Sequence, residues 1–98
     1  MPASLPALMR AQKIIRRQWQ AQGEGQTLCE VLGDVREALA AVESGAGEAQ
    51  LGAALEGLCK LAHVMDLDAE TALRSAITKR IEHLQKTEKK ILISSRKF

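Results

Sequence analysis

Residues 27–43 read TLCEVLGDVREALAAVE, and this stretch decides the fold class. Its apolar side chains recur every three or four residues, which is the period of one face of an α-helix. Thr27 and Glu30 have the spacing of a capping box, in which the hydroxyl accepts from the Glu30 N–H and the carboxylate reaches back to the Thr27 N–H. The stretch therefore predicts an amphipathic helix that begins near Leu28 and ends at the SGAG break of residues 44–47.

The two faces of this helix differ in chemistry. Its apolar face, which we expect to be buried, comprises Leu28, Val31, Leu32, Val35, Leu39 and Val42. The opposite face carries Glu30, Asp34 and Glu37 at positions i, i+4 and i+7. Such an acidic ridge is either a solvated helix face or a weak cation site.

The flanking sequence predicts three more helices with the same period. The first runs from about residue 6 to residue 22, and Gly23 and Gly25 end it. The third covers about residues 48–65, and its apolar stripe comprises Leu51, Leu55, Leu58, Leu61, Ala62 and Met65. The fourth begins with Asp68 as N-cap and continues through Leu73, Ile77, Ile81 and Leu84. We expect its basic end, about residues 86–98, to fray.

Composition supports one small helical domain spanning residues 1–98. The chain has 46 % hydrophobic residues and two prolines, and its aromatic residues are only Trp19 and Phe98, a composition that disfavours both disorder and sheets. We therefore predict an all-α domain of four antiparallel helices. Because a 98-residue domain buries a modest core, and helices one and three carry more apolar surface than one neighbour covers, we expect a homodimeric bundle.

The location expected for the protein is the cytoplasm. Cys29 and Cys59 lack metal-site spacing, no secretory leader precedes the first helix, and no apolar run approaches the roughly 20 residues that span a bilayer. Both cysteines therefore fit a reducing compartment. His63 and His83 lie on different predicted helices, and no metal site is expected from them.

Charge is segregated along the sequence. The middle is acidic, whereas bases cluster in residues 10–17 and 79–97. This pattern fits either a phosphate-facing surface or solvated helix faces. Nucleic acid is not an expected partner, because the basic end has no stacking aromatics and no DNA-reading motif.

Three segments together resemble the MazG-type nucleotide pyrophosphohydrolases. These are residues 5–14 (LPALMRAQKI), 35–44 (VREALAAVES) and 61–74 (LAHVMDLDAETALR). The resemblance spans nearly the whole chain and implies a four-helix MazG-like domain that forms a homodimer. It also implies a Mg²⁺-dependent hydrolysis of nucleoside triphosphates to monophosphate and pyrophosphate, with the metal held by a Glu-Glu-x-x-Glu motif on helix two and a Glu-x-x-Asp motif on helix three.

The carboxylates that this resemblance calls for are mostly missing. On helix three the motif positions hold Gln50 and Ala53, neither of which is an anionic ligand. Helix two aligns in two registers one heptad apart. The first register places the ligands at Ala38 and Ala41 beside Glu37. The second, which we prefer because it aligns without a gap, replaces the motif with Glu30, Val31 and Asp34 and leaves Asp34 as the one matched ligand.

We therefore interpret the chain as a catalytically degenerate MazG-like domain that binds a protein or a nucleotide without cleaving it. Lys79 remains as the one phosphate contact from the family's Asn-x-Lys motif, and no cofactor is expected. The alternative is an active Mg²⁺-dependent nucleoside triphosphate pyrophosphohydrolase with a relocated site built on Glu30, Asp34, Glu37 and Glu56.

Overall fold

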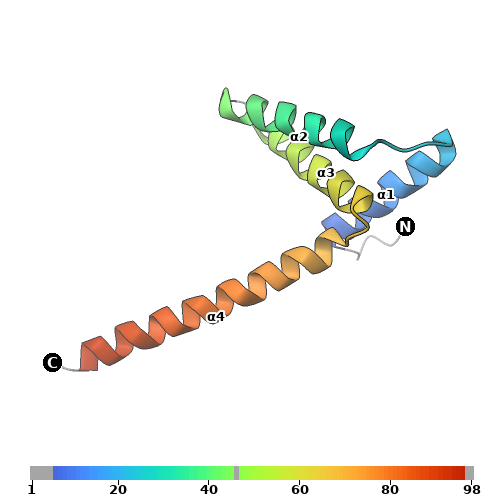
Figure 1. Ribbon diagram of the computed structural model, residues 1–98. Coiled ribbons are helices and arrows are strands. Elements are labelled where there is room, and N and C mark those ends of the chain that lie inside the picture. Colours follow the sequence, from blue (N-terminus) through green and yellow to red (C-terminus); the bar gives the residue numbers. More distant parts are fainter. Residues whose placement is uncertain (1–5, 46, 97–98) are drawn as a thin grey trace.

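The computed structural model describes residues 6–45 and 47–96, with side chains through residue 92. It contains four helices, α1 (Ala7–Gln22), α2 (Leu28–Glu43), α3 (Glu48–Val64) and α4 (Ala69–Arg96), and the described residues include no strand (Figure 1). The prediction of an all-α chain with four helices is therefore confirmed.

Local capping residues set where α2 begins and α1 ends. The Thr27 hydroxyl accepts from the Glu30 N–H at 3.3 Å and donates to a Glu30 carboxylate oxygen at 3.1 Å. The Glu30 carboxylate thus bonds the Thr27 hydroxyl and not the Thr27 N–H, where the predicted capping box places it. Gly23 ends α1 at a φ of 82°, a left-handed conformation that glycine adopts without steric cost.

Helices α2 and α3 form an antiparallel hairpin, which is the best-packed part of the fold (Figure 1). Val35 of α2 packs directly on Gly57 of α3, where a Cβ added to the glycine would lie 3.0 Å from the valine Cγ2. The absence of a side chain at Gly57 therefore lets the two helices approach closely.

Helix α3 is the central helix, because α1, α2 and α4 each pack against it. The α1–α3 contact buries Ile15 and Cys59 and brings the rings of Trp19 and His63 to a centroid separation of 5.2 Å. The core is accordingly small. Its buried apolar residues are Ile15, Val31, Val35, Ala54 and Cys59.

Helix α4 touches the body only through its first turns and then projects away from it (Figure 1). The molecule consequently measures 66 × 34 × 26 Å. The described part of α4 continues to Arg96, so the structure does not end this helix near residue 86, where fraying was expected. None of the described helices is long and apolar enough to cross a membrane.

Burial differs from the sequence-based expectation on most of the predicted apolar stripes. Only Val31 and Val35 of the α2 stripe are buried, and the α3 and α4 stripes are largely exposed. The exposed stripe residues include Leu28, Leu39, Leu51, Leu55, Leu58, Leu73, Ile77, Ile81 and Leu84. The expectation that these stripes would be buried is wrong for the single chain. Helix α4 projects away from the other three helices and does not close the bundle over the stripes.

Candidate functional site: an acidic groove on the α2–α3 hairpin

One side of the α2–α3 hairpin forms a groove of about 370 Å³. Helix α2 contributes Asp34, Glu37 and Ala38, and α3 contributes Ala53, Glu56, Gly57 and Lys60. We call this the acidic groove. Residues three or four apart share a helix face, so the spacing on each helix brings these side chains to one side of the hairpin.

The acidic groove contains some of the positions that the MazG resemblance singled out. Asp34, Ala38 and Ala53 line it. Val31 does not, because its side chain is 0 % exposed and belongs to the core. Gln50 lies one turn before Ala53, and its Oε1 accepts from the Gly47 N–H at 3.0 Å, so this side chain caps the start of α3.

The hairpin pairing decides which positions face each other. Since Val35 packs on Gly57, the antiparallel arrangement brings Ala38 opposite Ala53 and Ala41 opposite Gln50. These are the positions of the first register. Asp34, from the second register, lies one turn closer to the α2 N-terminus and faces the part of α3 near Lys60.

The acidic side chains of α2 already interact with the loop that precedes it. An Asp34 carboxylate oxygen accepts from Gln26 Nε2 at 2.9 Å, and Glu30 accepts from the Thr27 hydroxyl. Within residues 6–45 and 47–96, no three His, Cys, Asp or Glu side chains lie close enough together to hold a metal ion. Asp34, Glu37 and Glu56 thus line one groove without converging on a point.

Lys79 lies on a different part of the molecule from the acidic groove. It is exposed on α4, and α4 packs against α1 and α3 but not α2. The single chain therefore does not bring together Lys79 and Asp34, the two positions carried over from the family as phosphate contact and metal ligand.

Sequence reasoning missed Lys60 as a member of the acidic groove. Its position could have been found from the spacing of Ala53, Glu56 and Lys60, which places all three on one face of α3. It also missed a cavity of about 500 Å³ where α1 meets the α3–α4 turn. Lys13, Arg16 and His63 line this cavity together with Asp66 and Asp68, so its charges are mixed.

The two cysteines differ in environment. Cys29 is exposed on α2, whereas Cys59 is 1 % exposed. Burial raises the pKa of the Cys59 thiol above its ordinary value, and the neighbouring Glu56 carboxylate adds to the rise. Cys59 is therefore a protonated core residue at neutral pH, not a nucleophile.

Comparison of the chain with models of protein families, with curated proteins and with solved structures found no match.

Proposed function

We propose that this protein is a catalytically degenerate MazG-like domain that works as a homodimeric, cytoplasmic binding protein and does not hydrolyse nucleotides. The observation that carries the proposal is the pairing of Ala38 with Ala53 in the acidic groove. The packing of Val35 on Gly57 and the burial of Val31 favour the first register over the second, which the alignment had favoured, and under the first register these facing positions are where the resembling family has metal ligands.

The physical reason lies in what Mg²⁺ needs. It binds through carboxylate and phosphate oxygens in octahedral geometry and gives up its waters reluctantly. Methyl groups at Ala38 and Ala53 offer no ligand, and Gln50 is occupied in capping α3. The remaining acids are spread along the groove, so they do not replace the missing cage.

A protein ligand fits this chain better than a nucleotide does. A phosphate-binding site needs concentrated positive charge, and the acidic groove offers Lys60 against Asp34, Glu37 and Glu56. In contrast, large apolar side chains are exposed on all four helices. Exposed apolar surface of this extent marks sites of protein–protein contact.

The proposal is tested by incubating the protein with each nucleoside triphosphate and deoxynucleoside triphosphate in Mg²⁺ and measuring released pyrophosphate. We expect no turnover above the buffer blank. Turnover that is lost in Asp34→Asn would overturn the proposal.

A second experiment rebuilds the missing ligands. Ala38→Glu with Ala53→Asp adds two facing carboxylates beside Asp34 and Glu56, and we expect this variant to bind Mn²⁺ or Mg²⁺ by calorimetry. The matched control is Ala40→Glu with Ala49→Asp, which adds the same charge at exposed positions outside the groove. If both variants bind metal equally, the groove is not a lost metal site.

The alternative is an active pyrophosphohydrolase with a relocated site. It is favoured by one observation, the lining of a single groove by Asp34, Glu37 and Glu56 together with the cationic Lys60. It predicts that the unmodified protein binds Mg²⁺ and that Asp34→Asn with Glu56→Gln abolishes both binding and turnover.

A further inference from the structure

Helix α4 presents an apolar stripe that none of the other described helices covers. The stripe comprises Leu73, Ile77, Ile81, Leu84 and Ile91, each between 46 % and 61 % exposed. We call it the α4 stripe. An isolated helix gains little stability in water from its own hydrogen bonds, so a 28-residue helix with one apolar face is typical of a helix that packs against a partner.

The α2–α3 hairpin has a matching apolar face on the side away from the acidic groove. Its exposed residues are Leu28 and Leu39 of α2 and Leu51, Leu55 and Leu58 of α3, between 44 % and 53 % exposed. We call it the leucine face. The α4 stripe is about 27 Å long and the leucine face about 17 Å, measured from Leu28 to Leu39, so the stripe is long enough to cover the face.

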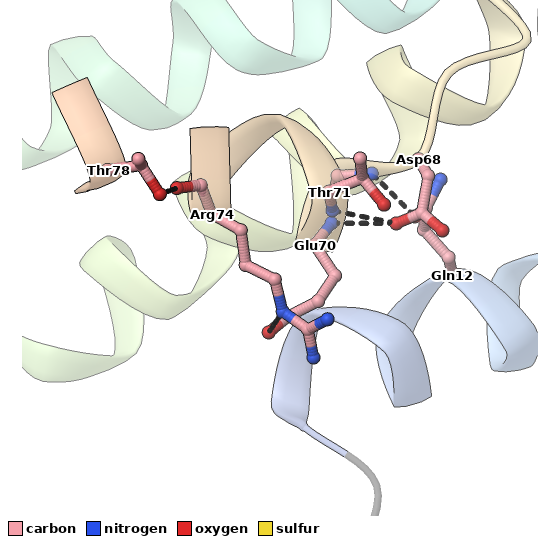
Figure 2. A network of polar contacts seen from close by, with 7 residues as sticks. Gln12, Asp68, Glu70, Thr71, Arg74 and Thr78 are labelled. Atoms are coloured by element: carbon pink, nitrogen blue, oxygen red, sulfur yellow. Dashed lines mark hydrogen bonds and ion pairs between the residues drawn. The ribbon is translucent and has the colours of Figure 1, made fainter. Parts of the chain in front are cut away.

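The start of α4 is held in a direction that keeps its stripe away from the leucine face of the same chain. Gln12 of α1 accepts from the Ala69 N–H at 2.8 Å and donates to the Leu67 carbonyl at 3.0 Å. Asp68 caps the helix by accepting from the N–H groups of Glu70 and Thr71 (Figure 2). Because α4 leaves the body along this line, none of the other described helices covers the stripe.

The chain exposes more area than a compact monomer of its mass, and the excess is of the size that a stable dimer buries. The chain exposes 7803 Å², whereas a compact monomer of 10.7 kDa exposes about 5,500 Å². The excess is about 2,300 Å² per chain, or roughly 4,600 Å² for two chains, which falls in the range of obligate homodimers.

Charge selects the second copy's hairpin, not its α4, as the surface that the stripe meets. Helix α4 carries seven basic and three acidic residues, whereas α2 and α3 together carry six acidic and two basic residues. Two α4 helices laid side by side would bring like charges together, which disfavours their association. Three of the six acids line the acidic groove on the other side, but Glu43, four residues after Leu39, and Glu48, three residues before Leu51, lie beside the leucine face, so a basic helix is attracted to it.

We propose that two copies of this chain exchange their α4 helices, so that the α4 stripe of each copy packs on the leucine face of the other. The exchange rests on the proposed homodimer and specifies its interface. Each copy then has its three-helix body completed by the partner's α4, and the contact is reciprocal, as a twofold axis requires.

Two variants test the exchange by sedimentation of the full chain. The stripe variant is Ile77→Asp with Ile81→Asp, and the face variant is Leu55→Asp with Leu58→Asp. The control is Ala72→Asp with Ser75→Asp, which adds the same charge to the exposed side of α4 away from the stripe. We expect the unmodified chain and the control to be dimers, and each of the two test variants to dimerise on the order of a hundredfold more weakly.

Mixing the two variants gives the decisive result. In the mixture, the intact α4 of the face variant can pack on the intact leucine face of the stripe variant, so we expect heterodimers although each variant alone is monomeric. This outcome does not require the substituted α4 to stay helical. Labelling one variant with a fluorophore measures the heterodimer directly.

The other outcomes are separable. A monomeric unmodified chain at 100 µM would overturn both the homodimer and the exchange. If the face variant alone stays dimeric, α4 pairs with α4, and if the stripe variant alone stays dimeric, the hairpins pair with each other. A dimeric face variant, a dimeric stripe variant or a mixture without heterodimers overturns the exchange but leaves the proposed homodimer and its binding function standing.

Discussion

At the scale of single residues, the same helix supplies both core and groove side chains within one turn. Val31 is fully buried, whereas Asp34, three residues later, is exposed at the acidic groove. The two positions lie about 60° apart around the helix axis, enough to move a side chain from the core to its edge. Restoring the second register would therefore require a carboxylate inside the core.

We expect Val31→Glu to destabilise the fold by about 3 kcal/mol or more, because an ionised carboxylate would lose its water without gaining a partner. Chemical denaturation measures the change, and Ala40→Glu, at an exposed position of the same helix, serves as control. Equal stability of the two variants would show that Val31 is not a core residue.

A second prediction at this scale concerns the thiols. Iodoacetamide at pH 8 should modify Cys29 in the folded protein and reach Cys59 only after denaturation, since Cys29 is exposed and Cys59 is buried with a raised pKa. Mass spectrometry of the peptides distinguishes the two sites. Equal labelling rates in the native protein would contradict the burial of Cys59.

The raised pKa of Cys59 also gives the sign of a pH effect. Below the ordinary thiol pKa of about 8.5, the folded and unfolded chains both keep the thiol protonated, so it adds no pH dependence. Above that pH the unfolded thiol ionises first, and the free energy of unfolding should fall. The fall should be smaller in Cys59→Ala, as measured by urea denaturation across pH 8 to 10.

At the scale of elements, the two glycines inside α3 have opposite surroundings. A Cβ at Gly57 would meet Val35 at 3.0 Å, whereas a Cβ at Gly52 would have nothing within 4 Å. Both cost helix stability relative to alanine. Only Gly57 compensates for this cost by allowing close packing of α2 on α3.

We therefore expect Gly52→Ala to stabilise the protein by up to about 1 kcal/mol and to raise its melting temperature. Gly57→Ala should lower the melting temperature, because displacing the buried Val35 costs about 1 to 3 kcal/mol and exceeds the gain in helix propensity. Each variant serves as the control for the other, since both replace a glycine of α3 with alanine. A similar rise in both variants would mean that α2 yields to the added methyl group.

At the scale of the whole molecule, three helices form an open body and the fourth leaves it (Figure 1). The buried core of a single copy is too small to account for the apolar stripes that the sequence carries. Stability should therefore depend on assembly, because whatever binds the folded state and not the unfolded one raises the melting temperature by mass action.

We expect the melting temperature to rise with protein concentration between 1 and 100 µM. The stripe variant Ile77→Asp with Ile81→Asp should show no such rise, because it loses the proposed interface. Differential scanning calorimetry measures both. Concentration-independent melting of the unmodified chain would contradict a homodimer.

Salt provides a further check on the proposed pairing of a basic helix with an acidic hairpin. Raising the NaCl concentration from 50 mM to 500 mM should increase the dimer Kd, because salt screens exposed charges. A dimer formed by two basic α4 helices would instead be strengthened by salt. Sedimentation at the two salt concentrations distinguishes these cases.

The sequence by itself determined where the helices begin and where the first three end, but not the end of α4, which continues to Arg96. Thr27 and Asp68 cap α2 and α4 through bonds to residues two or three positions away, and Gly23 ends α1 through its own φ. Such signals involve only neighbours in the chain, so they can be read without knowing the fold. The periodicity of the apolar residues, another local property, indicated an all-α chain.

Only the tertiary structure decided which apolar residues are buried and what lines the groove. Val31 and Leu55 belong to similar stripes, yet α3 covers the first and no helix of the chain covers the second. Gln12 holds the start of α4 by hydrogen bonds to Leu67 and Ala69, which are 55 and 57 positions further along the chain. Lys60 lines the groove because α3 packs on α2 at Val35 and Gly57. These features depend on contacts between residues far apart in the chain, and an apolar period shows that a face needs cover but not which helix covers it.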